Sequence, residues 1–264
     1  MMRKRLFALV LAALGACTAP SVQRAEAPDL PQTWNRATIV LPPLGTGAAL
    51  VTTVDSPAMQ ERMRRVPANA KLPVVLYVHG CTGMGGLALL QALAEAGFVV
   101  VAPDSFARRY RPLQCDAQNQ AGGRNLFVYD FRLEEVAYAL DQLWLRSWTD
   151  WEHLMLVGAS EGGVAAALYR GDEFAARVIL QWTCSGAPHV AGLAPGKQEP
   201  VLALLASNDP WYQRVGGGDC GTLLAGRRDS LSYLLTVAGG HELVAEPAAI
   251  RLVVEFLRRQ AYRG

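Results

Sequence analysis

Short apolar runs alternate with amphipathic segments from residue 73 onward, and this alternation constrains the fold more than any other feature. Apolar runs without polar alternation are typical of strands buried on both faces of a parallel sheet. We expect such strands at 73–78, 98–102, 154–157, 178–182, 201–205 and 231–237, after a first pair at 38–41 and 49–54. Apolar spacing of three and four predicts helices at 86–96, 130–146, 162–169 and 247–259. This order predicts an α/β fold with a mostly parallel central sheet and helices on both faces.

The composition favours one large domain and excludes a nucleic-acid-binding surface. The chain has 264 residues, of which 51% are hydrophobic, so a sizeable core is available. Its formal net charge is only +2 and no long basic run is present, so we expect no nucleic-acid partner. No Pro-rich or Ser-rich break interrupts residues 34–264, which we therefore interpret as a single domain.

The first residues have the pattern of a secretory signal peptide. The basic triplet R-K-R at 3–5 precedes an apolar run at 6–14, which is shorter than the about 20 residues that span a bilayer. The sequence L-G-A-C at 14–17 resembles the lipobox of bacterial lipoproteins, whose cysteine is lipidated. We expect export to the periplasm with a lipoprotein-type signal peptide at 1–16, an outer-membrane lipid anchor at Cys17, a tether at 17–33 and a folded domain at 34–264. The alternative is an ordinary signal peptide cleaved near Ala27.

Export would place the remaining cysteines in an oxidising compartment, where an even number favours disulfides. They are Cys81, Cys115, Cys184 and Cys220. Four cysteines allow three pairings, and their spacing does not choose among them. The expected fold favours Cys81–Cys115, after two neighbouring strands, and Cys184–Cys220, in loops after later strands. Four buried free thiols are the alternative.

The sequence G-A-S-E-G-G at 158–163 lies where an apolar strand gives way to a small-residue helix. A serine on so tight a turn needs small neighbours two residues to either side, and Gly158 and Gly162 meet that demand. This nucleophile elbow would present the Ser160 hydroxyl at the carboxyl edge of the sheet. The helix dipole and the backbone N–H of Glu161 would then face an oxyanion. The alternative is a serine that only caps the helix.

A serine nucleophile needs a general base and an acid that orients this base. Among the four histidines, His241 is best placed, because it follows the last predicted strand in the loop A-G-G-H. Asp209 follows the predicted strand at 201–205 and is the candidate acid, with Asp219 as the fallback. Ser160, Asp209 and His241 thus each follow a strand of their own and form a candidate catalytic triad.

The sequence H-G-C-T-G at 79–83 follows an early strand and offers the second oxyanion donor. We expect this donor to be the backbone N–H of Cys81, and we expect His79 to be structural. No cysteine–histidine spacing typical of zinc and no Gly-rich phosphate loop is present, so no metal or other cofactor is expected. The arginines at 108, 109 and 111 either line the mouth of the site and favour an acidic substrate, or form a solvated basic loop.

Five segments together resemble the dienelactone hydrolase-like branch of the α/β-hydrolases. They are H-G-C-T-G at 79–83, A-P-D-S-F-A-R at 102–108, G-A-S-E-G-G at 158–163, N-D-P-W at 208–211 and G-H at 240–241. The resemblance covers about residues 70–260 and implies an α/β-hydrolase fold. It implies Ser160 as nucleophile, Asp209 as acid and His241 as base, in the chain order that this fold uses.

One departure from the family bears on the substrate. Dienelactone hydrolases proper have a cysteine where this chain has Ser160, so the resemblance favours small-molecule carboxylic esters or lactones in general over dienelactone itself. The alternatives are acyl transfer or peptide hydrolysis by the same triad, and a non-catalytic, lipid-tethered binding module on the same fold.

Overall fold

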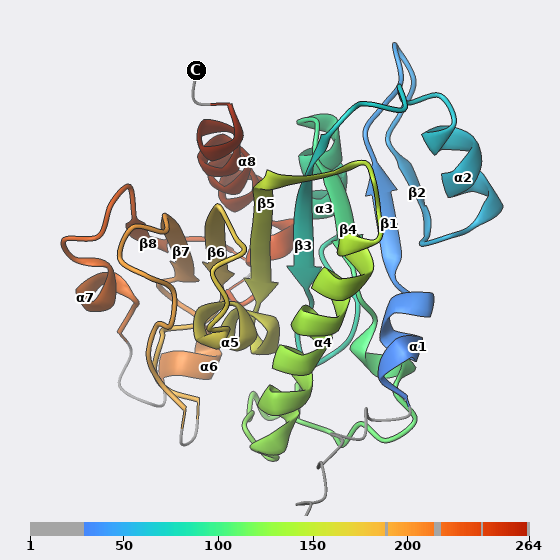
Figure 1. The fold of residues 1–264 in the computed structure, drawn as a ribbon. Helices are drawn as coiled ribbons and strands as arrows, with labels where there is room; N and C mark the ends of the chain where they lie inside the picture. The colour runs from blue at the N-terminus through green and yellow to red at the C-terminus, as the bar shows by residue number, and fades with distance from the viewer. Residues whose placement is uncertain (1–28, 188–189, 214–217, 239, 263–264) are drawn as a thin grey trace, which may run out of the picture.

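The computed structural model describes residues 29–187, 190–213, 218–238 and 240–262, and Figure 1 shows their arrangement. The signal peptide predicted at 1–16, the lipidation site Cys17 and the first part of the predicted tether lie outside the described residues. None of the helices in the described ranges combines the length and the apolar character that a membrane span needs.

In the described part of the chain, eight strands form one mixed sheet in the order β2-β1-β4-β3-β5-β6-β7-β8 (Figure 1). The strands are β1 (Thr38–Leu41), β2 (Leu50–Thr53), β3 (Leu72–Val78), β4 (Val99–Ala102), β5 (Thr149–Ala159), β6 (Ala176–Leu180), β7 (Val201–Ala206) and β8 (Leu231–Leu235). β1 is antiparallel to both β2 and β4, and the pairings from β4 to β8 are parallel. The predicted α/β fold with a mostly parallel sheet is therefore confirmed.

Helices cover both faces of the sheet. They are α1 (Leu30–Asn35), α2 (Pro57–Met63), α3 (Leu87–Glu95), α4 (Phe127–Trp144), α5 (Glu161–Leu168), α6 (Pro210–Gln213), α7 (Gly221–Leu224) and α8 (Pro247–Ala261), with short 3-10 turns at Ser105–Ala107 and Leu243–Ala245. The helices α3 and α8 pack on one face, and α1, α4 and α5 pack on the other. Figure 1 shows α4 across the front of the sheet and α3 behind it.

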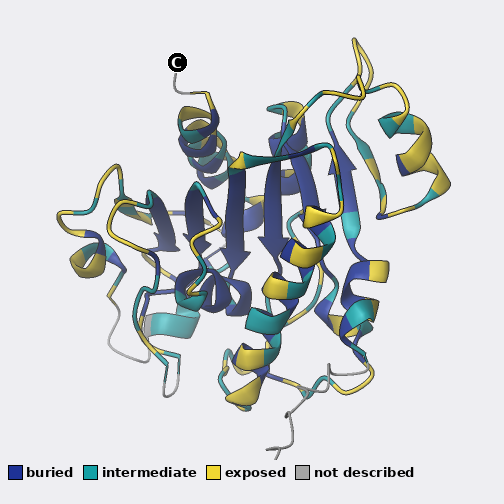
Figure 2. Cartoon of the chain, viewed as in Figure 1, coloured by how far each residue is buried: buried dark blue, intermediate teal, exposed yellow. Residues whose placement is uncertain are grey.

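The central strands are buried because each of their faces meets a helix layer (Figure 2). Successive side chains of a strand point to opposite faces. Val75 and Tyr77 of β3 therefore join the core cluster on the side of α3 and α8, and Val74 and Leu76 join the cluster on the side of α4. All residues of β4 and β7 are buried, which explains the unbroken apolar runs that predicted these strands.

The helix α1 corrects the predicted boundary between tether and domain. The sequence predicted a tether up to residue 33, but residues 30–35 form a helix with a proline in its first turn. Its Trp34 is buried and packs in the same cluster as Val136 and Leu140 of α4. The fold therefore includes residue 30 onward, because this apolar face finds its partner about 100 residues later in the chain. The short helices α2, α6 and α7 were also not predicted.

The order of the strands creates a binding position at the carboxyl ends of β3 and β5. The chain passes from β3 to β4 on one side, and from β5 to β6 on the other. Ligands of open α/β sheets bind outside the carboxyl ends of the strands at such a switch point. The loops after β3, β5, β7 and β8 meet at this edge, which is the lower edge of the sheet in Figure 1.

Candidate active site

The strand β5 turns directly into α5 at Ser160. The backbone of Ser160 has φ +55°, in the left-handed region that a non-glycine residue adopts only at a cost. A Cβ atom on Gly158 would overlap the carbonyl group of Gly162, and a Cβ atom on Gly162 would overlap the carbonyl group of Val78. The glycines are thus required by the close packing of this turn, as the nucleophile elbow predicts.

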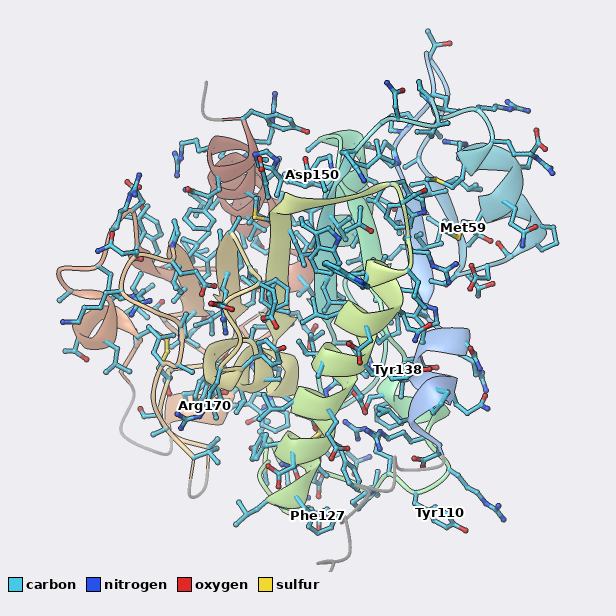
Figure 3. All side chains as sticks on the ribbon, in the orientation of Figure 1. Met59, Tyr110, Phe127, Tyr138, Asp150 and Arg170 are labelled. Atoms are coloured by element: carbon cyan, nitrogen blue, oxygen red, sulfur yellow. A yellow bond between two sulfur atoms is a disulfide. The ribbon has the colours of Figure 1, made fainter. Side chains whose placement is uncertain are left out.

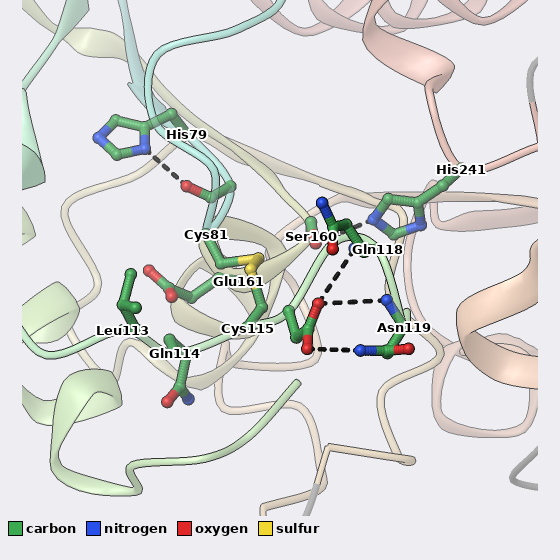
Figure 4. The surroundings of a disulfide bond; sticks show 12 residues. His79, Cys81, Leu113, Gln114, Cys115, Gln118, Asn119, Ser160, Glu161 and His241 are labelled. Atoms are coloured by element: carbon green, nitrogen blue, oxygen red, sulfur yellow. Dashed lines mark hydrogen bonds between the residues drawn. A yellow bond between two sulfur atoms is a disulfide. The ribbon is translucent and has the colours of Figure 1, made fainter. Parts of the chain in front are cut away.

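Three side chains from separate loops form one hydrogen-bonded chain. The Nε2 atom of His241 lies 3.0 Å from Ser160 Oγ, and its Nδ1 atom lies 2.7 Å from Asp209 Oδ2 (Figure 4 shows the first of these contacts). Because Nδ1–H donates to the carboxylate, Nε2 is left to accept the serine proton. The side chain of Asp209 is 1% exposed and that of His241 is 11% exposed. The structure therefore brings together the three residues that the sequence singled out.

The fallback acid Asp219 is not in contact with His241. Its Oδ1 atom accepts the N–H of Gly221 at 2.8 Å, at the start of α7. Asp209 instead precedes α6, and its Oδ1 atom accepts the N–H of Trp211 at 3.0 Å. The ring of Trp211 lies 5.2 Å from the His241 ring, measured between centroids. The start of α6 thus fixes Asp209 and also places an aromatic ring against the base.

His79 has a structural place, as expected. It is fully buried, its Nδ1 atom donates to the Gly80 carbonyl at 2.8 Å, and its Nε2 atom accepts the N–H of Ser105 at 3.0 Å. Burial and the nearby Arg132 hold the pKa of His79 well below its usual value, so the ring stays neutral. With both ring nitrogens engaged, His79 joins the turn after β3 to the turn after β4.

Two amide side chains that were not among the predicted site residues hold the loop of His241. Gln181 follows β6 with φ +60°, and its Nε2 atom donates to the carbonyl of His241. The hydroxyl of Tyr212 donates to the Gln181 carbonyl at 2.9 Å. Asn208 donates to the carbonyl of Val237 at 3.0 Å. The available signal for Gln181 was a single polar residue inside an otherwise apolar run at 178–182.

A buried ion-pair network lies beside the elbow. Glu161, the residue after the elbow serine, pairs with Arg111, and it lies 3.4 Å from the Nε atom of Arg132. Arg132 of α4 also pairs with Glu135 at 2.7 Å and donates to the His79 carbonyl at 2.8 Å. Burial raises the pKa of Glu161, and the two arginines act against that rise. The network links the turn after β5 to the turn after β3.

Two of the arginines in the loop at 108–111 are buried and face neither the site mouth nor solvent. Arg108 pairs with Glu135 at 2.7 Å, and Arg111 pairs with the glutamate of the elbow. Tyr110, which lies between them, is 67% exposed (Figure 3). Arg109 is exposed, as the solvated loop predicts. Neither interpretation was right for Arg108 and Arg111, because acidic partners 27 and 50 residues further along the chain fold against them.

Both disulfides favoured by the predicted fold are present. Cys81–Cys115, with a Cα–Cα distance of 5.9 Å, joins the loop after β3 to the long loop after β4. Cys184–Cys220, with a Cα–Cα distance of 5.1 Å, joins the loop after β6 to the start of α7. Figure 4 shows the first bridge beside Ser160 and Glu161. The first bridge therefore belongs to the wall of the site.

Two cavities meet at Ser160, one of about 450 Å³ and one of about 240 Å³. Cys81, Ser160 and Trp211 line both cavities, and Glu161 lines the smaller one. The two residues expected to supply oxyanion donors thus lie in the wall beside the serine. Within the described ranges, no group of three or more histidine, cysteine, aspartate or glutamate side chains is placed to hold a metal ion.

Comparison with known proteins identifies the family. A sequence model of the dienelactone hydrolase family matches residues 62–215, which is more than half of the chain. No curated protein matches the chain by sequence. The matched range contains the H-G-C-T-G segment, the elbow and Asp209.

Solved structures share the fold at low sequence identity. A candidate dienelactone hydrolase from Klebsiella pneumoniae subsp. pneumoniae has a TM-score of 0.54 and 18% identity, over 85% of this chain and 100% of its own. An esterase from Pyrobaculum calidifontis has a TM-score of 0.50 and 16% identity, over 88% of this chain and 89% of its own. The family match and the shared fold lead to one conclusion: the chain belongs to the dienelactone hydrolase family, within the α/β-hydrolases, and is a hydrolase of ester type.

Proposed function

We propose that this chain hydrolyses carboxylic esters or lactones, with Ser160 as nucleophile, His241 as general base and Asp209 as the acid that orients His241. The observation that carries the proposal is the position of the His241 ring, 3.0 Å from Ser160 Oγ and 2.7 Å from Asp209 Oδ2. These are distances at which a base can take a proton. The side chain of Ser160 makes no capping hydrogen bond to α5, which argues against a serine that only caps the helix.

The reaction follows from this geometry. Ser160 Oγ forms a bond to the ester carbonyl carbon while its proton moves to His241 Nε2. His241 then returns the proton to the alkoxide oxygen as the carbon–oxygen bond breaks, and an acyl-enzyme remains. Water attacks the acyl-enzyme by the same route and releases the carboxylic acid. Asp209 keeps the proton of His241 on Nδ1, so that Nε2 is free at the start of each half-reaction.

The oxyanion of each tetrahedral intermediate needs two N–H donors, for which we propose Cys81 and Glu161. Glu161 is the first residue of α5, so its N–H has no partner within that helix. The segment that carries Cys81 lies close to the serine, since a Cβ atom on Gly80 would be 3.3 Å from Ser160 Cβ. These contacts support both donors.

Labelling with a fluorophosphonate tests the proposal. Attack by an activated serine oxygen on phosphorus expels fluoride, so the wild-type chain should be labelled at Ser160 and the Ser160→Ala variant should not. Turnover of p-nitrophenyl acetate should fall by about 10⁴-fold or more in Ser160→Ala, with the thermal unfolding midpoint unchanged. Turnover near wild type in this variant would contradict the proposal. A wild-type chain without any label would favour the binding-module alternative.

We also propose that the chain is exported and anchored to the outer membrane, facing the periplasm, through a lipid on Cys17. The two disulfides are consistent with an exported protein, because such bonds persist in oxidising compartments. Labelling with a radioactive fatty acid should mark the wild-type chain, and Cys17→Ser should remove the label and move the enzyme to the soluble fraction. Equal fractionation of both forms would refute the anchor.

A further inference from the structure

The two cavities that meet at Ser160 differ in their relation to the base. The larger cavity is lined by His241 itself, together with polar residues such as Asn208 and Glu242. The smaller cavity extends instead along the start of α5, where Glu161 and Val164 line it. Among its described lining residues, His241 is absent.

The proposed chemistry assigns the two halves of an ester to these cavities. His241 must give its proton to the leaving oxygen, so the alcohol part of the substrate has to lie within hydrogen-bond reach of His241 Nε2. That requirement places the alcohol in the larger cavity. The acyl part stays bonded to Ser160 Oγ after the alcohol leaves, and the space that remains for it is the smaller cavity beside α5.

The wall of the smaller cavity is mostly apolar. The apolar and aromatic side chains that line it are those of Tyr129, Val164, Ala187, Trp211 and Tyr212, and the amides of Gln114 and Gln120 also line it. The hydroxyl of Tyr212 already donates to the Gln181 carbonyl, and burial raises its pKa, so this side chain stays neutral. The apolar and aromatic residues of this wall offer contacts to a hydrocarbon chain, and the two amides offer hydrogen bonds but no charge.

The described residues that line the smaller cavity also supply no cationic side chain to pair with an acidic substrate. Among its described lining residues there is no arginine, lysine or histidine, and the charged residue there is Glu161. The two cations nearest to that carboxylate, Arg111 and Arg132, are themselves buried and paired with it. A carboxylate on the acyl chain would meet the amides of Gln114 and Gln120 there but no opposite charge, and it would lie beside the like charge of Glu161, which is unfavourable.

We propose that the smaller cavity is the acyl-binding subsite and that it selects uncharged, apolar acyl chains, whereas the alcohol part occupies the larger, more polar cavity. The assignment rests on the proposed function, because it uses His241 as the proton donor to the leaving group. The expected substrates are therefore esters of a hydrocarbon acid, with an alcohol part that can be larger and more polar than the acyl part.

Two matched substitutions and four esters test the assignment. Ala187→Phe fills the smaller cavity and Ala238→Phe fills the larger one. The substrates are methyl acetate, methyl hexanoate, benzyl acetate and benzyl hexanoate, with kcat/KM followed by titration of the released acid. Ala187→Phe should lower the hexanoate-to-acetate ratio by about tenfold or more and leave the benzyl-to-methyl ratio unchanged. Ala238→Phe should do the reverse.

A charged acyl chain supplies a second comparison on the wild-type enzyme. The benzyl monoester of glutaric acid resembles benzyl hexanoate in length but carries a carboxylate at the end of its acyl chain. Its kcat/KM should be lower by at least about tenfold. Equal turnover of these two esters would overturn the selection for uncharged chains.

The outcomes separate this inference from the proposed function. If the wild-type enzyme hydrolyses none of the esters, the proposed function itself fails. If it hydrolyses them but Ala238→Phe, rather than Ala187→Phe, alters the dependence on acyl length, only the subsite assignment is overturned.

If Ala187→Phe does not fold, Val164→Ala serves instead, because it enlarges the smaller cavity. This variant should raise the ratio of kcat/KM for the octanoate ester to that for the hexanoate ester. An unchanged ratio would overturn the assignment. The truncation Val244→Ala, in the larger cavity, is its matched control.

Discussion

The nucleophile and the base of the candidate site are held by different kinds of structure. Ser160 follows β5 at the centre of the sheet, between β3 and β6, where the surrounding strand residues are buried. His241 follows β8, the edge strand, on which three large apolar side chains are exposed. The two side chains nevertheless meet at 3.0 Å.

The difference lies in what fixes each group. Around Ser160 the backbone of one segment packs directly on the backbone of another, and glycines at 158 and 162 leave no space for one more atom. His241 is held by two hydrogen bonds to side chains: its ring N–H donates to Asp209, and its backbone carbonyl accepts from Gln181. We therefore expect changes at the two elbow glycines to affect folding and activity together, and changes around His241 to affect activity with little change in folding.

Gly162→Ala should give the largest effect. Its Cβ atom would overlap the Val78 carbonyl, which belongs to the backbone of β3 and has no room to move. We expect a loss of more than about 4 kcal/mol in the free energy of unfolding, or no soluble protein, together with loss of ester turnover. Urea unfolding and turnover of p-nitrophenyl acetate measure both.

The control is Gly196→Ala, where no atom lies within 4 Å of the added Cβ. Its free energy of unfolding should stay within about 0.5 kcal/mol of the wild-type value. A Gly162→Ala protein with the stability and turnover of its control would show that close packing does not fix the elbow.

Asp209→Asn should act on chemistry alone. The amide has nearly the shape of the carboxylate, but it does not hold the His241 proton on Nδ1 or stabilise the charged ring, and the equivalent change in a serine protease lowers kcat by about 10⁴. We expect a loss of that order with a nearly unchanged unfolding midpoint in urea. Asp219→Asn is the matched control and should keep kcat within about twofold, because Asp219 contacts Gly221 and not His241. A larger loss in Asp219→Asn would mean that the acid is misassigned.

The central half of the molecule was predictable because its signals are local. The strands β3, β4 and β7 lie between helices, so nearly every residue in them had to be apolar. The elbow was predictable because its backbone leaves space only for glycine at 158 and 162. Asp209 and His241 could be proposed because each follows such a strand at the same edge of the sheet.

What the sequence did not predict depends on contacts between distant segments. The residues of α1 carry no strong helical pattern, and their helix is stabilised by packing of Trp34 against α4. The pairing of Arg111 with Glu161 crosses 50 residues of sequence, so the loop could be interpreted only as basic. The hydrogen bond from Gln181 to His241 crosses 60 residues, and a glutamine at the end of a strand gives no indication of its partner.

Removal of each disulfide should give an effect of intermediate size, and it again separates an effect on folding from an effect on activity. They close loops of similar length, with separations of 34 and 36 residues, so loss of either should lower the free energy of unfolding by about 3–4 kcal/mol in the chain-entropy model. Cys81 and Cys115 line the smaller cavity. The double variant Cys81→Ser/Cys115→Ser should therefore also lower kcat, by about tenfold or more, because the proposed donor N–H of Cys81 is less firmly placed.

Cys184→Ser/Cys220→Ser is the comparison for this prediction. It should show a similar loss in the urea midpoint with kcat within about twofold of wild type, measured well below the unfolding transition. If both double variants lose kcat equally, the first bridge has no special part in positioning Cys81.

Gln181→Met should give the smallest effect. Methionine has a similar length and can fill the buried site, but the His241 carbonyl loses its donor and the loop of the base becomes less firmly held. One hydrogen bond contributes about 0.5–1.5 kcal/mol, so kcat/KM should fall by about two- to tenfold. Gln60→Met is the matched control, because the Gln60 amide also donates to a backbone carbonyl, at 3.0 Å, but on the exposed helix α2. It should leave kcat/KM unchanged. If Gln181→Met lowers the unfolding midpoint while kcat/KM stays at the wild-type value, the amide supports the fold and does not position His241. The base would then be held by its hydrogen bond to Asp209 without help from Gln181, and the contrast with a nucleophile fixed by backbone packing would be weaker.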